Sequence, residues 1–107
     1  MKHKIDKILV DVKEELNKLY RTRLKKILLY GSYARNEEMG GSDIDLLAVL
    51  DNLTSIDEEI SSMSETLSIL SLRYGVTISV LPIKEADYLH LHTSLLINIR
   101  KEGIEIA

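Results

Sequence analysis

Two aspartates separated by one residue are the feature of this sequence that points most clearly to a chemical role. Asp43 and Asp45 stand at the head of the apolar run 46–50. Alternate side chains of an extended chain share a face, so both carboxylates are expected to point the same way. An acid inside an apolar run is costly to bury alone, and hard carboxylate oxygens suit Mg²⁺ or Mn²⁺. The pair predicts a divalent metal site; a polar strand entry or a cap formed by Ser42 and Asp43 is the plainer alternative.

A Gly-Ser pair lies upstream of the aspartates, directly after the apolar run 27–30. Gly31 lets the backbone approach a ligand closely, and the hydroxyl and amide of Ser32 can bind phosphate oxygens. Arg35, one turn further on, can neutralise charge on a leaving pyrophosphate. Alone, the pair would indicate an ordinary strand-to-helix turn. Together with Asp43 and Asp45 it predicts nucleotidyl transfer from a metal-bound nucleoside triphosphate.

The surrounding pattern predicts the elements that position these residues. Apolar residues recur at helical spacing over 3–22 and from 55 to 74, where Thr54 or Ser55 caps the helix and Gly75 ends it. Short apolar runs predict strands, and the region 84–102 is expected to be helical with a break near residues 92–93. A helical turn is expected over 32–36, a loop over 37–42, strands over 27–30, 44–50 and 76–81, and a β-like tail over 104–106. This order predicts one α/β (α+β) domain over residues 1–107, with a mixed sheet of three or four strands flanked by helices.

Composition narrows the class of protein. The 107-residue chain has no cysteine, which excludes disulfides and thiol catalysis and fits a reducing compartment. No signal peptide or run of membrane-spanning length is visible, so a cytoplasmic protein without a membrane partner is expected. The formal net charge of −3 disfavours direct binding to nucleic acid, which depends on Lys and Arg.

The spacing of the two motifs resembles a known family. Gly31-Ser32, ten intervening residues and then Asp43-Ile44-Asp45 are similar to the signature of the DNA polymerase β-type nucleotidyltransferase superfamily. The small size and the local forms around Arg35 and Asp45 resemble its minimal nucleotidyltransferase (MNT) branch, from the first helix through the third strand.

The resemblance implies a function and a set of roles. Asp43 and Asp45 would be catalytic and hold Mg²⁺ (or Mn²⁺), while Gly31, Ser32 and Arg35 would bind ATP, the substrate. MNT proteins pair with HEPN-domain ribonuclease toxins as their antitoxins, and some transfer AMP to a toxin tyrosine. The chain is thus expected to be such an antitoxin and a protein adenylyltransferase.

Two positions depart from the family pattern. Asn36 follows Arg35 where Gly is common, a mild change because Asn tolerates left-handed backbone. More seriously, the third strand carries Ser79 where the family usually has a third carboxylate that activates the attacking hydroxyl. Glu85 and Asp87, beyond that strand, are alternative bases. The missing acid keeps a second hypothesis open, in which the chain neutralises its toxin by binding alone; a third is a transferase for a small molecule or RNA with a separate substrate-binding subunit.

Overall fold

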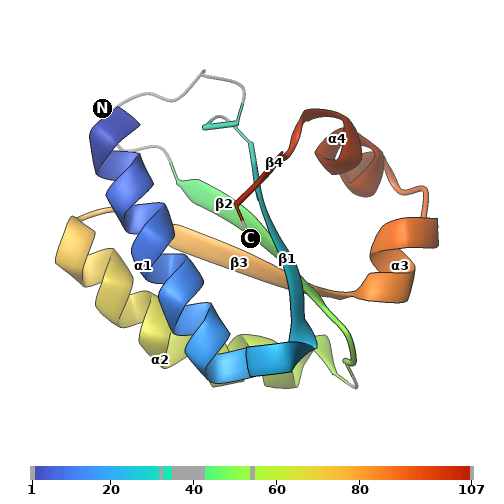
Figure 1. The fold of residues 1–107 in the computed structure, drawn as a ribbon, viewed down its shortest axis with the longest axis horizontal. Helices are drawn as coiled ribbons and strands as arrows, with labels where there is room; N and C mark the ends of the chain where they lie inside the picture. Colours follow the sequence, from blue (N-terminus) through green and yellow to red (C-terminus); the bar gives the residue numbers. More distant parts are fainter. Residues whose placement is uncertain (1, 32, 35–42, 54, 107) are drawn as a thin grey trace.

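A computed structural model describes the chain except for residues 1, 32, 35–42, 54 and 107. The described elements mix helices and strands along the chain, with β1 followed by β2 and α3 followed by α4 (Figure 1). They are α1 (Lys2–Tyr20), the 3-10 turn η1 (Arg21–Arg23), β1 (Leu24–Tyr30), β2 (Ile44–Leu50), α2 (Ile56–Tyr74), β3 (Ile78–Lys84), α3 (Glu85–His90), α4 (Ser94–Glu102) and β4 (Ile104–Glu105). None of the helices in this described part is long and apolar enough to cross a membrane.

The strands form one mixed sheet in the order β3-β2-β1-β4. β1 runs antiparallel to both β2 and β4, whereas β2 and β3 are parallel. The crossover between the parallel strands is α2, as parallel pairing requires. The four-stranded mixed sheet with flanking helices confirms the predicted fold class.

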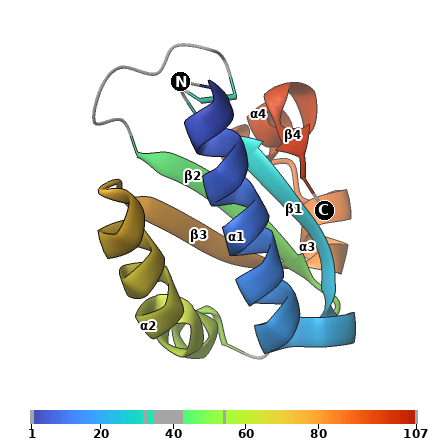
Figure 2. The same ribbon diagram turned by 60° about the vertical axis from the view of Figure 1, so that its left-hand side comes forward.

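Helices α1 and α2 pack on one face of this sheet (Figure 2). The apolar stripe of α1 lies against inward side chains of the strands, and Met63 and Leu70 of α2 complete the main core. Its fully buried members include Val12, Leu16 and Ile27. This packing explains why α1 carries apolar residues at helical spacing with Lys and Glu between them.

Helices α3 and α4 cover part of the opposite face, where a second cluster contains Leu47, Val49, Tyr88, Leu96 and Ile99. Because β2 is covered on both sides, its residues 46–50 are all buried. A strand buried on both faces is apolar without interruption, as the sequence over this stretch is. Asp45 lies on the α3/α4 face, two residues before Leu47.

Three predicted boundaries were wrong. The first helix stops at Tyr20, because Arg21 adopts a left-handed φ of 52° and leads into the 3-10 turn. β1 begins at Leu24 rather than at residue 27. The third strand spans 78–84 rather than 76–81 and runs through Pro82, which an edge strand tolerates because no neighbour needs the missing N–H.

Other local predictions are confirmed. The Ser55 side chain accepts a hydrogen bond from the Glu58 N–H at the start of α2, and Gly75 ends this helix with a φ of 65°. The expected break in the last helical region separates α3 from α4, where the Thr93 hydroxyl accepts from the Leu96 N–H. The tail forms β4 against β1.

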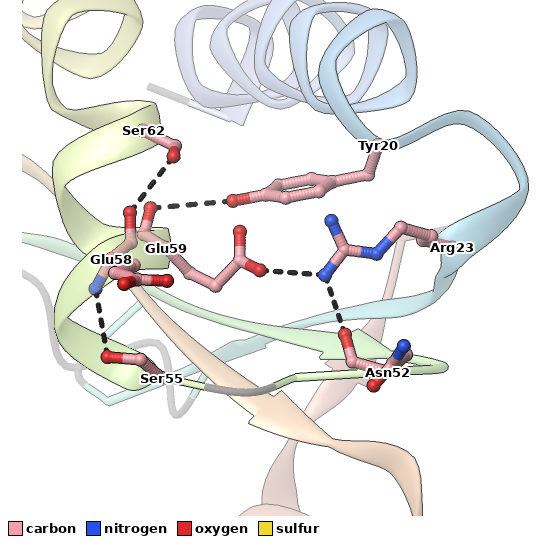
Figure 3. Close-up of polar contacts among 7 residues, drawn as sticks. All are labelled: Tyr20, Arg23, Asn52, Ser55, Glu58, Glu59 and Ser62. Atoms are coloured by element: carbon pink, nitrogen blue, oxygen red, sulfur yellow. Dashed lines mark hydrogen bonds and ion pairs between the residues drawn. The ribbon is translucent and has the colours of Figure 1, made fainter.

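A polar clamp joins the elements at the end of the sheet remote from Asp45 (Figure 3). The Arg23 guanidinium donates to Glu59 at 2.7 Å and to the Asn52 carbonyl at 2.6 Å. Its charge also lies 5.4 Å from the centre of the Tyr20 ring. The clamp ties the η1 turn to α2 and to the segment after β2, and so holds β1 and β2 in their relative positions.

Candidate active site

Gly31 and Asp45 meet where β1 ends and β2 begins. Tyr30, the last residue of β1, is the Cα partner of Asp45, so Gly31 follows directly beside this carboxylate. Gly31 has a φ of 76°, and a Cβ atom at this position would lie 2.6 Å from Asp45 Oδ2. Glycine is therefore required here both for its backbone conformation and for the space that the carboxylate occupies.

The two aspartates lie as the alternation predicted. Asp43 is exposed immediately before β2, Asp45 is half-buried within it, and the intervening Ile44 is fully buried. Burial, followed by the charge of Asp43, raises the pKa of Asp45 above its usual range. A divalent cation between the carboxylates would offset both effects, because it neutralises the like charges and replaces lost hydration. The donor set therefore fits Mg²⁺ or Mn²⁺.

A row of three side chains crosses the sheet at this level. Tyr30 of β1 pairs with Asp45 of β2, which in turn pairs with Ser79 of β3. Burial, followed by the nearby Asp45 carboxylate, raises the pKa of Tyr30. The sequence analysis did not assign Tyr30 to the site, although its position directly before Gly31 was an available signal.

The register places Ser79 where a third carboxylate would face Asp45. Ser79 is exposed and adjacent to the aspartate on the neighbouring strand. Glu85 and Asp87 lie beyond the far end of β3, whose last residue is five positions, roughly 16 Å, past Ser79. This separation rules out direct replacement of the missing acid by either residue. In the part of the chain that the structure describes, no group of three or more acidic, His or Cys residues is arranged to hold a metal.

Ser32 and Arg35, the other two predicted nucleotide-binding residues, lie outside the described residues. Their roles stay predictions. What the described residues bring together is Gly31, Asp43, Asp45, Tyr30 and Ser79, at one end of the sheet. This arrangement offers two oxygen ligands for a cation and a close backbone approach for a phosphate-bearing ligand.

Comparison with known proteins places this geometry in a family. Residues 10–106 match the family described as polymerase beta, nucleotidyltransferase. Two curated proteins of Methanocaldococcus jannaschii carry the provisional name protein adenylyltransferase. One is 38% identical over 96 residues, covering 86% of this chain and 90% of the relative. The other is 26% identical over 102 residues, covering 95% and 98% respectively.

Solved structures show the same fold. A chain from a toxin–antitoxin crystal structure with AMP-PNP superposes with a TM-score of 0.62 at 19% identity, over 98% of this chain and 71% of that one. A chain from a complex of tri-AMPylated Shewanella oneidensis HEPN toxin with MNT antitoxin gives a TM-score of 0.53 at 16% identity, over 94% and 71%. The family match over nearly the whole sequence, with its Gly31–Asp45 geometry, shows that this chain belongs to the polymerase beta nucleotidyltransferase family.

Proposed function

We propose that this chain is the antitoxin of a HEPN ribonuclease toxin and transfers AMP from ATP to a tyrosine of that toxin, with Mg²⁺ or Mn²⁺. The observation that carries the proposal is Asp45 held against Gly31, with Asp43 two residues before it, in a chain of this family. The names of the two M. jannaschii relatives support protein adenylylation. The toxin–antitoxin complexes among the structural neighbours, one of them AMPylated, support the choice of partner.

Each residue of the candidate site has a proposed role in such a transfer. Asp43 and Asp45 would hold the cation, which supplies charge stabilisation to the phosphates when it is bound. Gly31 leaves room for the Asp45 carboxylate itself, and Ser32 and Arg35 are proposed to bind the triphosphate. The acceptor tyrosine oxygen forms a bond to the α-phosphorus while the bond to the bridging oxygen breaks. Pyrophosphate leaves with that electron pair, and the tyrosine proton passes to water.

The serine at position 79 is expected to lower the rate of this transfer. A serine hydroxyl is not a base at neutral pH, so the site supplies no carboxylate from β3 to accept the tyrosine proton. General-base assistance contributes roughly 10²–10⁴-fold. We therefore expect a transfer that is slower than in relatives with the third acid but still driven by charge stabilisation and positioning.

The test uses the purified chain, the protein encoded beside its gene, which the proposal predicts to be a HEPN-domain protein, α-labelled ATP and Mg²⁺. The proposal predicts label on the HEPN protein with wild type and none with Asp43→Ala. Asp51→Ala is the matched control, because Asp51 is an exposed acid at the other end of β2 and should leave labelling unchanged. No label on the partner, with wild type and Asp43→Ala indistinguishable, would sink the catalytic proposal.

The alternative is an antitoxin that masks its toxin without catalysis, and Ser79 beside Asp45 is the observation that favours it. It predicts that an Asp43→Ala/Asp45→Ala variant still rescues cells from the toxin. Failure of the variant to rescue, despite normal folding and normal binding to the toxin, would count against masking and for adenylylation.

A further inference from the structure

A groove of about 620 Å³ lies between α2 and the outer edge of β3. Its walls are mainly apolar and include Ile60, Leu67, Leu72 and Val80, with serines of α2 between them. None of the described residues that line it is charged, although charged residues make up 29% of the sequence. An uncharged, hydroxyl-bearing groove suits a polypeptide segment and not a nucleic acid, whose phosphates require cations.

Two of the apolar side chains that line this groove are open to solvent, whereas Met63, Ile78 and Val80 form its buried floor. Leu72 is 85% exposed and Ile60 is 42% exposed. The spacing of residues 56, 60, 63, 67 and 70 predicts one buried stripe, yet its first two members, Ile56 and Ile60, are exposed. A β-strand added at the outer edge of β3 would cover the side chains of Ile60 and Leu72.

Only the first half of β3 offers backbone hydrogen-bonding groups to such a strand. The Ile44 N–H donates to the Thr77 carbonyl at 2.9 Å, so in a parallel pair the odd-numbered residues of β3 face β2. Ile78 and Val80 therefore present backbone groups to the groove, where Ser71 Oγ accepts from the Ile78 N–H at 3.2 Å. Proline and lysine are devices that block strand addition. Both occur in β3, but only at positions 82 and 84. Residues 77–81 carry neither, and because Ser71 caps the Ile78 N–H, the groups that Ile78 and Val80 offer to an added strand are the Ile78 carbonyl and the Val80 N–H and carbonyl.

This part of the β3 edge is continuous with the candidate active site. Ser79 lines the groove and is also the Cα partner of Asp45. Strands in a sheet lie about 4.8 Å apart, so an added residue opposite Ser79 would stand roughly 10 Å from the Asp45 backbone. Alternation would place that residue on the face of Asp45 and its two neighbours on the face of the groove.

We propose that an extended segment of the acceptor protein adds to the sheet along residues 77–81. Its apolar side chains fill the groove beside Leu72, and a hydroxyl-bearing residue between them lies next to Ser79, facing Asp45. The identity of the occupant as acceptor rests on the proposed adenylyltransferase function. The main-chain hydrogen bonds of the added strand supply affinity, and the groove supplies selectivity for apolar residues at alternate positions.

The test places charge in the groove without touching the aspartates. Leu72→Lys/Ser68→Lys introduces two cations at exposed positions of the groove wall. Ile69→Lys is the matched control, because Ile69 is an equally apolar, 50% exposed residue of α2 outside the lining. The HEPN-domain protein of the preceding test is the acceptor, and a fluorescent ATP analogue with Mg²⁺ reports separately on the nucleotide site.

The proposal predicts that the groove variant binds the analogue like wild type but binds and labels the acceptor roughly tenfold less or worse, since burying a charge in an apolar contact is costly. Amide exchange of Val80, whose N–H points to the groove, should slow when wild type binds the acceptor. Acceptor binding that is unchanged in the groove variant would overturn the docking proposal, as would a wild-type dimer that the variant converts to monomer. If wild type binds the acceptor but never labels it, adenylylation fails while the binding difference still decides the docking site.

Discussion

The Asp45 carboxylate occupies the space that a side chain at residue 31 would need. Asp45 Oδ2 would lie 2.6 Å from a Cβ atom on Gly31, which also has a left-handed φ of 76°. The end of β1 and the start of β2 therefore lie in close contact at Asp45, one of the two predicted metal ligands. The position of one candidate ligand thus depends on the absence of a side chain fourteen residues earlier in the sequence.

Gly31→Ala should damage this end of the sheet in two ways. The left-handed backbone costs a non-glycine residue about 1–2 kcal/mol, and the new methyl group must displace Asp45. Gly75→Ala provides the matched control, because its φ of 65° carries similar strain with nothing within 4 Å. Chemical denaturation should show a loss of stability in both variants, whereas AMP transfer should fall only in Gly31→Ala. Equal transfer by the two variants would show that the contact with Asp45 has no role in the site.

Asp45→Asn should separate stability from metal binding. The substitution removes a half-buried negative charge beside Asp43, so the metal-free variant should be more stable than wild type at neutral pH. With ATP present, Mg²⁺ at a hundred times its dissociation constant should stabilise wild type by about 2.7 kcal/mol and the variant far less. Thermal unfolding with and without Mg²⁺–ATP measures both effects. A variant that gains as much from Mg²⁺ as wild type does would exclude Asp45 as a ligand.

Ser79→Asp should increase the rate of AMP transfer. The register places this residue beside Asp45. A carboxylate there is positioned to accept the proton of the tyrosine hydroxyl that receives AMP. The expected gain is on the order of 10²-fold, at the low end of general-base assistance. Ser79→Asn is the control of similar shape without a base, and single-turnover labelling compares the two. A rate that is unchanged or lower in Ser79→Asp than in Ser79→Asn would refute a missing base as the limitation.

Glu59→Gln should lower the free energy of unfolding by about 1–3 kcal/mol. Glu59 is buried and accepts from Arg23 at 2.7 Å, so its loss leaves the guanidinium without its charged partner. Glu15→Gln, which breaks the exposed 3.2 Å pair with Lys18, should change stability by less than about 0.5 kcal/mol. Urea unfolding at neutral pH compares these variants, and equal losses would mean that the clamp in Figure 3 does not hold the fold.

Tyr20 should make stability depend on pH in the alkaline range. Burial, followed by the Glu59 carboxylate, raises the pKa of Tyr20 to about 12, above its ordinary value near 10. Between these values the folded chain keeps a proton that the unfolded chain has lost, so stability falls as pH rises. The Tyr20→Phe variant has no such titration, so its free energy of unfolding should not fall for this reason. The difference in free energy of unfolding between wild type and this variant should therefore shrink between pH values of about 8 and 11. A constant difference in urea unfolding across that range would contradict the assignment.

Much of the fold was predictable because local pattern and tertiary role agree. The uninterrupted apolar run of β2, the Ser55 cap and Gly75 each determine a local structure that packing then preserves. The extent of β3 was not predictable in this way. Its continuation through Pro82 depends on its place at the sheet edge, which no local pattern encodes.

The site was predictable only in part. Alternation placed Asp43 and Asp45 correctly, because it is a property of the strand itself. Tyr30 and Ser79 join Asp45 through cross-strand register, and register depends on which strands pair.

The most direct test of adenylylation is mass spectrometry of the purified HEPN partner after incubation with this chain, ATP and Mg²⁺. We predict AMP on a partner tyrosine with wild type, and none when Asp43→Ala/Asp45→Ala replaces it at equal binding. A partner that stays unmodified after prolonged incubation with wild type, although the two proteins bind and the toxin is neutralised, would contradict the account and establish masking instead.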